Sequence, residues 1–152
     1  MALGVAGCGG SSDNGFDAYL GGVSEGVVSI ADGRAAFAAR DILALDGTAA
    51  DAAVAAAMVL AVVDPAAAGL GGGGACLVHD SVAGQTQALD FRPAAGGDPA
   101  QVAVPGSVRG LFALSRQYGR LEWWQLLEPA AHLARFGSLV DAGLAGDLLA
   151  DA

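Results

Sequence analysis

The sequence has few of the residues that usually carry metal-binding or redox chemistry. Its 152 residues include two cysteines and two histidines, Cys8, Cys76, His79 and His132. They form no C-x-x-C or H-E-x-x-H pattern, and the scattered carboxylates add no ligand cluster. No serine lies in the nucleophile elbow of a Ser-His-Asp hydrolase. We therefore expect no metal site and no bound cofactor, and no catalytic nucleophile with its base stands out.

Basic residues are also scarce. Seven basic residues stand against 16 acidic ones, which gives a formal net charge of −9. Nucleic acids and anionic membranes bind basic patches, so this balance argues against both as partners. A negative overall charge still leaves room for a local basic pocket that binds a carboxylate.

Aromatic residues make up only 6% of the chain, although 54% of its residues are hydrophobic. This composition is typical of a globular protein of about one domain, in which alanine and glycine fill much of the interior. Small residues let helices pack closely, but each contact buries little apolar area. We therefore expect the fold to depend on contacts with further polypeptide. No apolar run is long enough to span a membrane.

Residues 1–21 are interpreted as a signal-like segment followed by a polar tether. The stretch "VAGC" at residues 5–8 resembles the lipobox of bacterial lipoproteins, in which the cysteine is lipidated and becomes the N-terminus. This pattern makes Cys8 the candidate lipidation site and favours a periplasmic or other extracytoplasmic location. A cleaved secretory signal without lipidation and a chance match are the alternatives. The folded part is expected at residues 22–152.

Five glycines occupy the six positions from Gly69 to Gly74 and match the spacing G-x-G-x-x-G. A dinucleotide-binding loop of this spacing follows a strand and opens a helix. Here the order is reversed, because an alanine-rich helix is expected at 48–63 and a strand at 75–80. We expect instead that the helix and strand backbones approach closely here, and that the turn requires positive φ.

The segment before the glycine run predicts a strand at residues 26–31 and an amphipathic helix over 34–47, ended by Gly47. The expected apolar face of this helix contains Phe37, Ile42 and Leu45. Thr48 and Asp51 then have the spacing of a capping box. Asp51 lies in a first helical turn, where a carboxylate suits the helix dipole, so we interpret it as structural rather than catalytic.

The segment after the glycine run predicts a β-hairpin and then helices. The strands are expected at 75–80 and 86–91, and the helices at 106–119, 122–137 and 141–152. Pro129 either kinks the second of these helices or marks the meeting of two helices. The residues expected to be structural are Cys76 as a small buried hydrophobe, His79 at a strand end, Trp123 and Trp124 as packing anchors, and His132 as partly buried scaffold.

Arg92, in the stretch "ALDFRP", is the residue whose position most suggests a site. Strand alternation places Asp90 and Arg92 on one face and Leu89 and Phe91 on the other. An arginine at a strand end can grip a carboxylate through two hydrogen bonds. The equal alternative is a surface ion pair between Asp90 and Arg92, which would contribute little.

Three blocks of the sequence are similar to the amino-terminal part of γ-glutamyltransferases, also called glutathione hydrolases. They are "ILALDGTAADAAVAAAMVLAVVDPAAAGLGGGGACLVHD", "ALDFR" and "VPGSVRGLFALSRQYGRLEWWQLLEPAAHLARFG", in the order found in that family. Together they cover most of residues 22–150. One departure is that Arg92 is followed by Pro93, where the family usually has glutamate.

The resemblance implies an α+β fold, the αββα sandwich of the Ntn-hydrolases, present here as an N-terminal part. Family members cut themselves into two subunits, and the new N-terminal threonine of the small subunit attacks the γ-glutamyl amide. That threonine and the small subunit lie outside this chain and would be its partners, with small molecules such as glutathione as substrates. The resemblance also implies that Arg92 binds the substrate α-carboxylate and that the glycine-rich turn is a packing element. The alternative is a non-catalytic lipoprotein that keeps this scaffold as a binding module.

Overall fold

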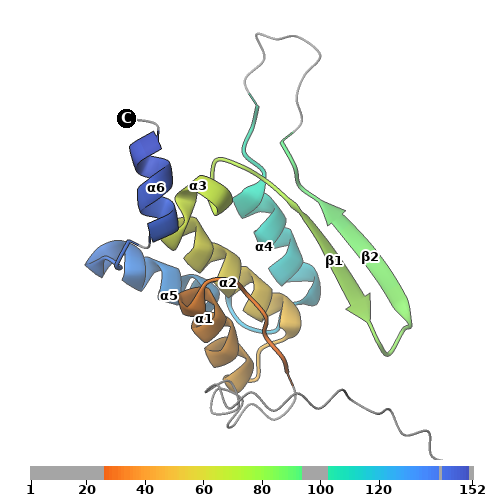
Figure 1. The fold of residues 1–152 in the computed structure, drawn as a ribbon. Coiled ribbons are helices and arrows are strands. Elements are labelled where there is room, and N and C mark those ends of the chain that lie inside the picture. The colour runs from red at the N-terminus through yellow and green to blue at the C-terminus, as the bar shows by residue number, and fades with distance from the viewer. Residues whose placement is uncertain (1–25, 94–102, 141, 151–152) are drawn as a thin grey trace, which may run out of the picture.

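The computed structural model describes residues 26–93, 103–140 and 142–150. Within these ranges the chain is mostly helical, with one β-hairpin beside the helices (Figure 1). The elements in chain order are α1 (Gly33–Ala44), α2 (Ala49–Val63), α3 (Pro65–Ala68), β1 (Ala75–Asp80), β2 (Gln85–Asp90), α4 (Ser107–Tyr118), α5 (Trp123–Phe136) and α6 (Ala142–Ala150).

Helix α2 forms the centre of the core, and α1, α4 and α5 pack around it (Figure 1). Val54 and Val59 of α2 are fully buried, as is Leu126 of α5. Many of the other buried positions of α1 and α2 are alanines, so the two helix backbones can lie close together. The core is therefore made of many small contacts, as the composition predicted.

The predicted hairpin is confirmed, and its strands pair antiparallel with Cys76 opposite Leu89 and Val78 opposite Gln87. Cys76, Val78 and Leu89 are partly buried and pack against the helical core. Leu77, on the opposite face, is 75% exposed. The described residues form no further strand beside this pair, so neither outer edge of the hairpin is paired with a strand in the described part of the chain.

The strand predicted at residues 26–31 is wrong. Residues 26–30 are described without regular secondary structure, and no strand among the described residues pairs with them. They lie against α1, where the Leu43 side chain comes within 2.8 Å of the position of a Cβ added at Gly26. The apolar pattern was correct in marking a packed segment, but a strand also needs a hydrogen-bonding neighbour.

Helix α1 was predicted correctly, but not its buried face. The helix begins after the N-cap Asp32, whose carboxylate accepts hydrogen bonds from the first turn. Phe37 is 39% exposed and Leu45 is 61% exposed, so both point away from the core; Ile42 alone of the expected face is buried. The buried positions are Ala35, Ala38, Ala39 and Ile42. Close contact between α1 and α2 selects the small side chains, because a phenylalanine would hold the helices apart.

The end of α1 lies near Gly47, as predicted, but the left-handed residue is Asp46, with φ of 65°. The Gly47 N–H donates to the Ile42 carbonyl at 3.0 Å, and the Asp46 N–H donates to Leu43 at 3.1 Å. This is the hydrogen-bond pattern of a Schellman motif. Glycine is needed at position 47 for space, since an added Cβ would lie 2.7 Å from the Ile42 carbonyl oxygen.

Helices α4 and α5 confirm the two predicted helices between residues 106 and 137. Helix α5 runs without interruption through Pro129, so the alternative of two helices meeting there is wrong. Trp123 packs against the core, with its ring 5.3 Å from that of Phe112 in an edge-to-face arrangement. Trp124 is 63% exposed and is not a packing anchor in the described chain.

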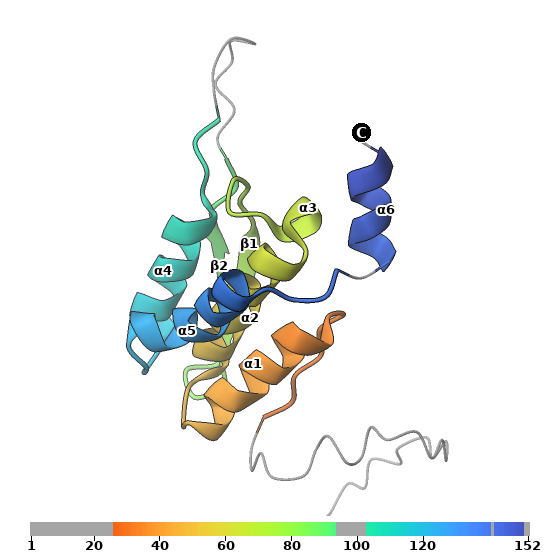
Figure 2. The same cartoon turned by 90° about the vertical axis from the view of Figure 1, so that its left-hand side faces the viewer.

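Two further expectations concern single residues at the edge of the helical group. His132 is exposed rather than partly buried, and its ring lies 4.7 Å from that of Phe136, one helical turn away. The last predicted helix is present as α6, which lies at the edge of the other helices (Figure 2). Among the described helices, none combines the length and the apolar character that a membrane crossing requires.

Candidate functional site

Arg92 lies two residues beyond the end of β2 and forms an ion pair with Asp90. Its Nε–H donates to Asp90 Oδ1 at 2.9 Å, and Nη2–H donates to Asp90 Oδ2 at 2.6 Å. The Arg92 backbone N–H also donates to Asp90 Oδ1 at 3.1 Å. Both side chains are exposed. Asp90 and Arg92 therefore lie on one face, as the strand alternation predicted. The surface ion pair between them, which was the alternative to a binding role for Arg92, is present.

This pairing shifts the titration of both groups. The Arg92 guanidinium and backbone N–H lower the pKa of Asp90 to about 2, and Asp90 raises the pKa of Arg92. Both groups are therefore charged at neutral pH. Asp90 occupies the Nε and Nη2 edge of the guanidinium, whereas Nη1 has no hydrogen-bond partner among the described residues. The Nη1 side can donate to a second carboxylate.

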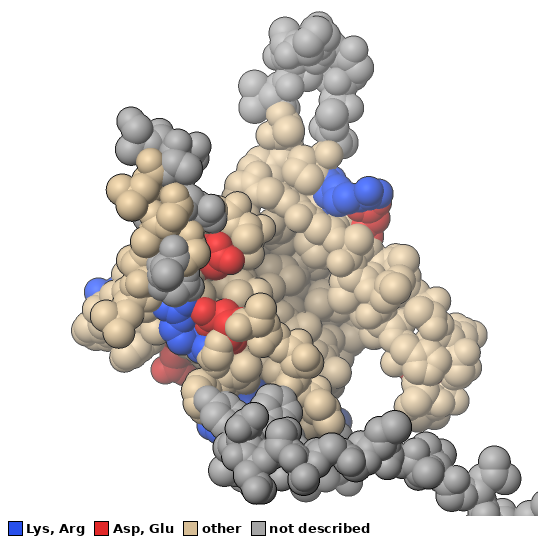
Figure 3. Space-filling view, viewed as in Figure 1, with Lys and Arg blue, Asp and Glu red and all other residues tan. Residues whose placement is uncertain are grey.

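Arg92 lines a pocket of about 550 Å³ between the end of β2 and the first turns of α4. Arg109, from α4, is the other basic residue that lines it, and Asp90 is the acidic one. The rest of the lining is apolar or glycine. Figure 3 shows a blue and red cluster at the open end of the hairpin, and a second group of charged side chains on the other side of the same face. The pocket therefore combines an apolar wall with positive charge, which suits a small carboxylate ligand.

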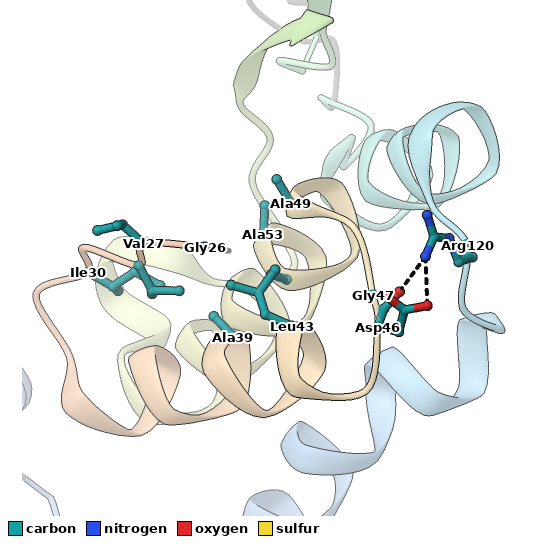
Figure 4. Close-up of a pocket in the computed structure, with 12 residues that line it drawn as sticks. Gly26, Val27, Ile30, Ala39, Leu43, Asp46, Gly47, Ala49, Ala53 and Arg120 are labelled. Atoms are coloured by element: carbon teal, nitrogen blue, oxygen red, sulfur yellow. Dashed lines mark hydrogen bonds and ion pairs between the residues drawn. The ribbon is translucent and has the colours of Figure 1, made fainter. Parts of the chain in front are cut away.

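A second pocket, of about 640 Å³, lies between residues 26–30, α1 and α2. Its lining is mainly apolar (Figure 4). At one end, Arg120 Nη1–H donates to the Asp46 carbonyl oxygen at 3.1 Å and to Asp46 Oδ2 at 2.9 Å. The Arg120 guanidinium and the Asp46 carboxylate are thus paired with each other. Among the described residues that line this pocket there is no cysteine, serine, threonine or histidine.

Asp51 has the structural role that its position predicted. Its Oδ2 accepts from the Thr48 N–H at 2.9 Å, while the Thr48 hydroxyl accepts from the Asp51 N–H at 3.1 Å, which is the predicted capping box. Asp51 is fully buried and lies in neither pocket. It has no access to a substrate in the described chain.

Sequence reasoning missed the residues that surround the strand end next to Arg92. Phe91 contacts glycines from three places in the chain: Gly73 and Gly74 in the glycine run, Gly106, and Gly110 in α4. The run does approach another backbone closely, but that backbone is the one at residues 91–93 and not the expected pair of the preceding helix and the following strand. The expected positive φ is wrong, since the described glycines with positive φ are Gly84 and Gly137, outside the run. Phe91, next to Arg92, could have indicated this contact, because a bulky side chain requires small residues opposite it.

The remaining predicted sites are not placed by the structure. Cys8 lies outside the described residues. In residues 26–93, 103–140 and 142–150, no three histidine, cysteine or acidic side chains come together as a metal-binding group.

The comparisons with known proteins agree on one family. Residues 35–151 match the family model of γ-glutamyltranspeptidase. The chain is 40% identical over 119 residues to glutathione hydrolase 7 of Rattus norvegicus, covering 69% of this chain and 18% of the relative. It is 38% identical over 128 residues to glutathione hydrolase 2 of Arabidopsis thaliana, covering 74% and 22%.

Solved structures give the same result for the fold. The γ-glutamyltranspeptidase of Pseudomonas nitroreducens, complexed with L-DON, matches with a TM-score of 0.78 and 30% identity, over 84% of this chain and 44% of that chain. The Helicobacter pylori γ-glutamyltranspeptidase matches with a TM-score of 0.76 and 32% identity, over 82% and 42%. The predicted α+β Ntn-hydrolase fold is confirmed by these neighbours.

The chain spans about a fifth of the length of the curated relatives named above. Within that span, the family model covers most of the described residues, and the fold agrees with solved members. The chain therefore belongs to the γ-glutamyltranspeptidase family.

Proposed function

We propose that this chain supplies the α-carboxylate-binding part of a γ-glutamyltransferase, or glutathione hydrolase, with Arg92 as the binding residue. The observation that carries the proposal is the position of Arg92. It stands at the end of β2, lines a pocket, and keeps its Nη1 side without a partner among the described residues. The family membership supplies the reaction class.

In this proposal the nucleophile is a threonine in polypeptide outside these 152 residues. The threonine hydroxyl attacks the γ-glutamyl amide carbon, and its own α-amine accepts the proton. The C–N bond breaks, the amine leaves with a proton, and a γ-glutamyl ester remains on the enzyme. Water or the amine of an amino acid then takes the γ-glutamyl group. The partner of this chain is accordingly the threonine-bearing subunit, and glutathione is a suitable substrate.

Arg92 takes no part in proton transfer in this scheme. Its guanidinium holds the α-carboxylate of the γ-glutamyl group through charge-assisted hydrogen bonds, so that the amide faces the threonine. Asp90 fixes the orientation of the guanidinium by binding its Nε and Nη2 edge, which leaves Nη1 for the substrate. Because Arg92 stays charged over the whole range in which enzymes work, substrate binding through it is independent of pH near neutrality.

The proposal can be tested in a hybrid enzyme. In the hybrid, residues 26–150 of this chain replace the matching segment of the Pseudomonas nitroreducens γ-glutamyltranspeptidase. We expect the hybrid to process itself and to hydrolyse a chromogenic γ-glutamyl anilide. The 152-residue chain alone should give no turnover, because the threonine lies outside it.

Arg92→Ala in the hybrid should lower kcat/KM by about 30-fold to a few thousand-fold, since losing a charge-assisted bond to a desolvated carboxylate costs about 2–5 kcal/mol. Arg92→Lys should recover part of the loss, because an ammonium group lacks the forked geometry. Self-processing should survive both changes. The matched control is Arg40→Ala, which removes an exposed Arg–Asp pair outside the pocket. A kcat/KM for Arg92→Ala within threefold of the unchanged hybrid would remove Arg92 from the site.

A further inference from the structure

We propose that Gly73 and Gly110 are positioning residues that set the place of Arg92, by leaving room for the backbone and ring that precede it. The inference rests on the proposed role of Arg92. It explains why the glycine run, Gly106 and Gly110 converge on one strand end.

The backbone around Arg92 lies directly on the glycine run. The Phe91 N–H donates to the Gly74 carbonyl at 2.9 Å. A Cβ added at Gly73 would lie 2.9 Å from Arg92 Cα and 2.7 Å from Pro93 Cδ, and would overlap the Phe91 carbonyl oxygen. Ordinary contact begins near 3.4 Å, so a methyl group here must push residues 91–93 away by about half an ångström or more.

Helix α4 closes on the same strand end from the other side. The Gly106 and Ser107 N–H groups donate to the Gly72 carbonyl at 2.8 and 3.2 Å, which ties the start of α4 to the run. A Cβ at Gly106 would overlap the Phe91 carbonyl oxygen. A Cβ at Gly110 would overlap the Phe91 ring and lie 2.5 Å from Phe91 Cβ. Phe91 is therefore held between the run and α4, and Arg92 follows it directly.

The glycines of the run are not equivalent. A Cβ at Gly71 would meet nothing within 4 Å, and one at Gly72 would meet only the Gly69 carbonyl, at 3.5 Å. Neither residue has positive φ, so alanine can be placed there without backbone strain. Gly71→Ala is therefore a matched control for Gly73→Ala, two residues away in the same loop.

Arg92 itself is exposed, so its side chain is not held in place by a surrounding wall. The place of the guanidinium therefore depends on the backbone at 91–93 and on the ion pair with Asp90. A displacement of about 1 Å in a binding group can cost on the order of 100-fold in rate or affinity. A methyl group at position 73 should therefore weaken substrate binding without touching the substrate.

The test is a double-mutant cycle in the hybrid enzyme. Gly73→Ala should raise KM for the γ-glutamyl anilide by about 10- to 100-fold with little change in kcat, while Gly71→Ala should leave both unchanged. In the Arg92→Ala background, Gly73→Ala should not change KM further, because Gly73 affects substrate binding only through the position of Arg92. An equal loss in both backgrounds would show a merely structural role and overturn the inference. If Arg92→Ala alone is neutral, the proposed function fails instead.

Two further measurements cover the case in which a variant folds poorly. Gly110→Ala should also raise KM, and adding Phe91→Ala should restore part of it, because alanine lacks the ring that the new methyl group overlaps. In the 152-residue chain, hydrogen exchange should show that Gly73→Ala loses protection at the Phe91 amide, whereas Gly71→Ala keeps it. Unchanged protection and unchanged NMR shifts at residues 91–93 in Gly73→Ala would remove the steric basis of the inference.

Discussion

The carboxylate of Asp51 accepts a hydrogen bond from the backbone N–H of Arg120 at 2.8 Å, across 69 residues of sequence. The same oxygen, Oδ2, accepts from the Leu121 N–H at 3.3 Å and from the Thr48 N–H at 2.9 Å. One buried side chain thus caps α2 and also holds the segment between α4 and α5. Its other oxygen, Oδ1, has no hydrogen-bond partner among the described residues.

Asp51→Ala should be much more destabilising than the loss of an ordinary helix cap. It leaves the N–H groups of Thr48, Arg120 and Leu121 without their acceptor, and we expect the free energy of unfolding to fall by about 2–4 kcal/mol. Thr48→Ala removes only the hydroxyl half of the capping box and should cost about 1 kcal/mol. Urea unfolding followed by circular dichroism compares the two. Equal losses would mean that the link to residues 120 and 121 contributes nothing.

Asp46 should tolerate asparagine and glycine but not valine. Its φ of 65° is accessible to glycine and asparagine, whereas a β-branched residue in the left-handed region loses about 1–2 kcal/mol. Asp46→Asn and Asp46→Val both remove the ion pair with Arg120, so the difference between them isolates the backbone conformation. Thermal melting of the three variants measures it. A valine variant as stable as the asparagine variant would contradict the left-handed assignment.

The Asp90–Arg92 pair should appear in the titration of Asp90. We expect a carboxyl midpoint at about 2 in the chain, and a return toward 3.8 in Arg92→Ala. Because the folded pKa is below the ordinary value, the pair favours the folded state above about pH 3.8, and this contribution is lost as the pH falls toward 2. Carbon-13 NMR of the Asp90 carboxyl follows the change. A midpoint near 3.8 in the unchanged chain would show that the pair does not form in solution.

Cys8 should be lipidated when the chain is exported from a bacterium behind a basic signal segment. The stretch "VAGC" at 5–8 then places Cys8 at the new N-terminus, and the protein should appear in the membrane fraction. Cys8→Ser is the control and should remain unlipidated. Mass spectrometry of the mature N-terminus decides between the alternatives, since an unmodified Cys8 or a different cleavage site excludes the lipobox.

Features that depend on neighbouring residues could be predicted from the sequence. The capping box of Thr48 and Asp51, the hairpin after the glycine run and the end of α4 before Gly119 each follow from short-range hydrogen bonding and turn chemistry. The alternation of Asp90 and Arg92 follows from the two-residue period of a strand. These are the features that the structure confirms.

Features that depend on contacts with residues far away in the sequence could not be predicted from it. Hydrophobicity placed Phe37 in the core, but the close contact of α1 with α2 is made by alanines, and no local pattern states which face is in contact. Residues 26–31 have the composition of a strand without a pairing neighbour in the described chain. The meeting of Gly73 with Gly110 around Phe91 joins three distant segments, so it became visible only in the fold.

The hydrogen bonds of Asp51 also have a consequence for the order of events during synthesis. When α1 and α2 leave the ribosome, the amide groups of residues 120 and 121 have not yet been made. At about 5–20 residues per second, the 69 residues from Ala52 to Arg120 take roughly 3–14 s to add. During that interval only Thr48 and water can donate hydrogen bonds to the Asp51 carboxylate. The face of α2 that α5 covers in the folded chain is then exposed. We therefore expect α2 to reach its final packing only after residues 120 and 121 and α5 have been made.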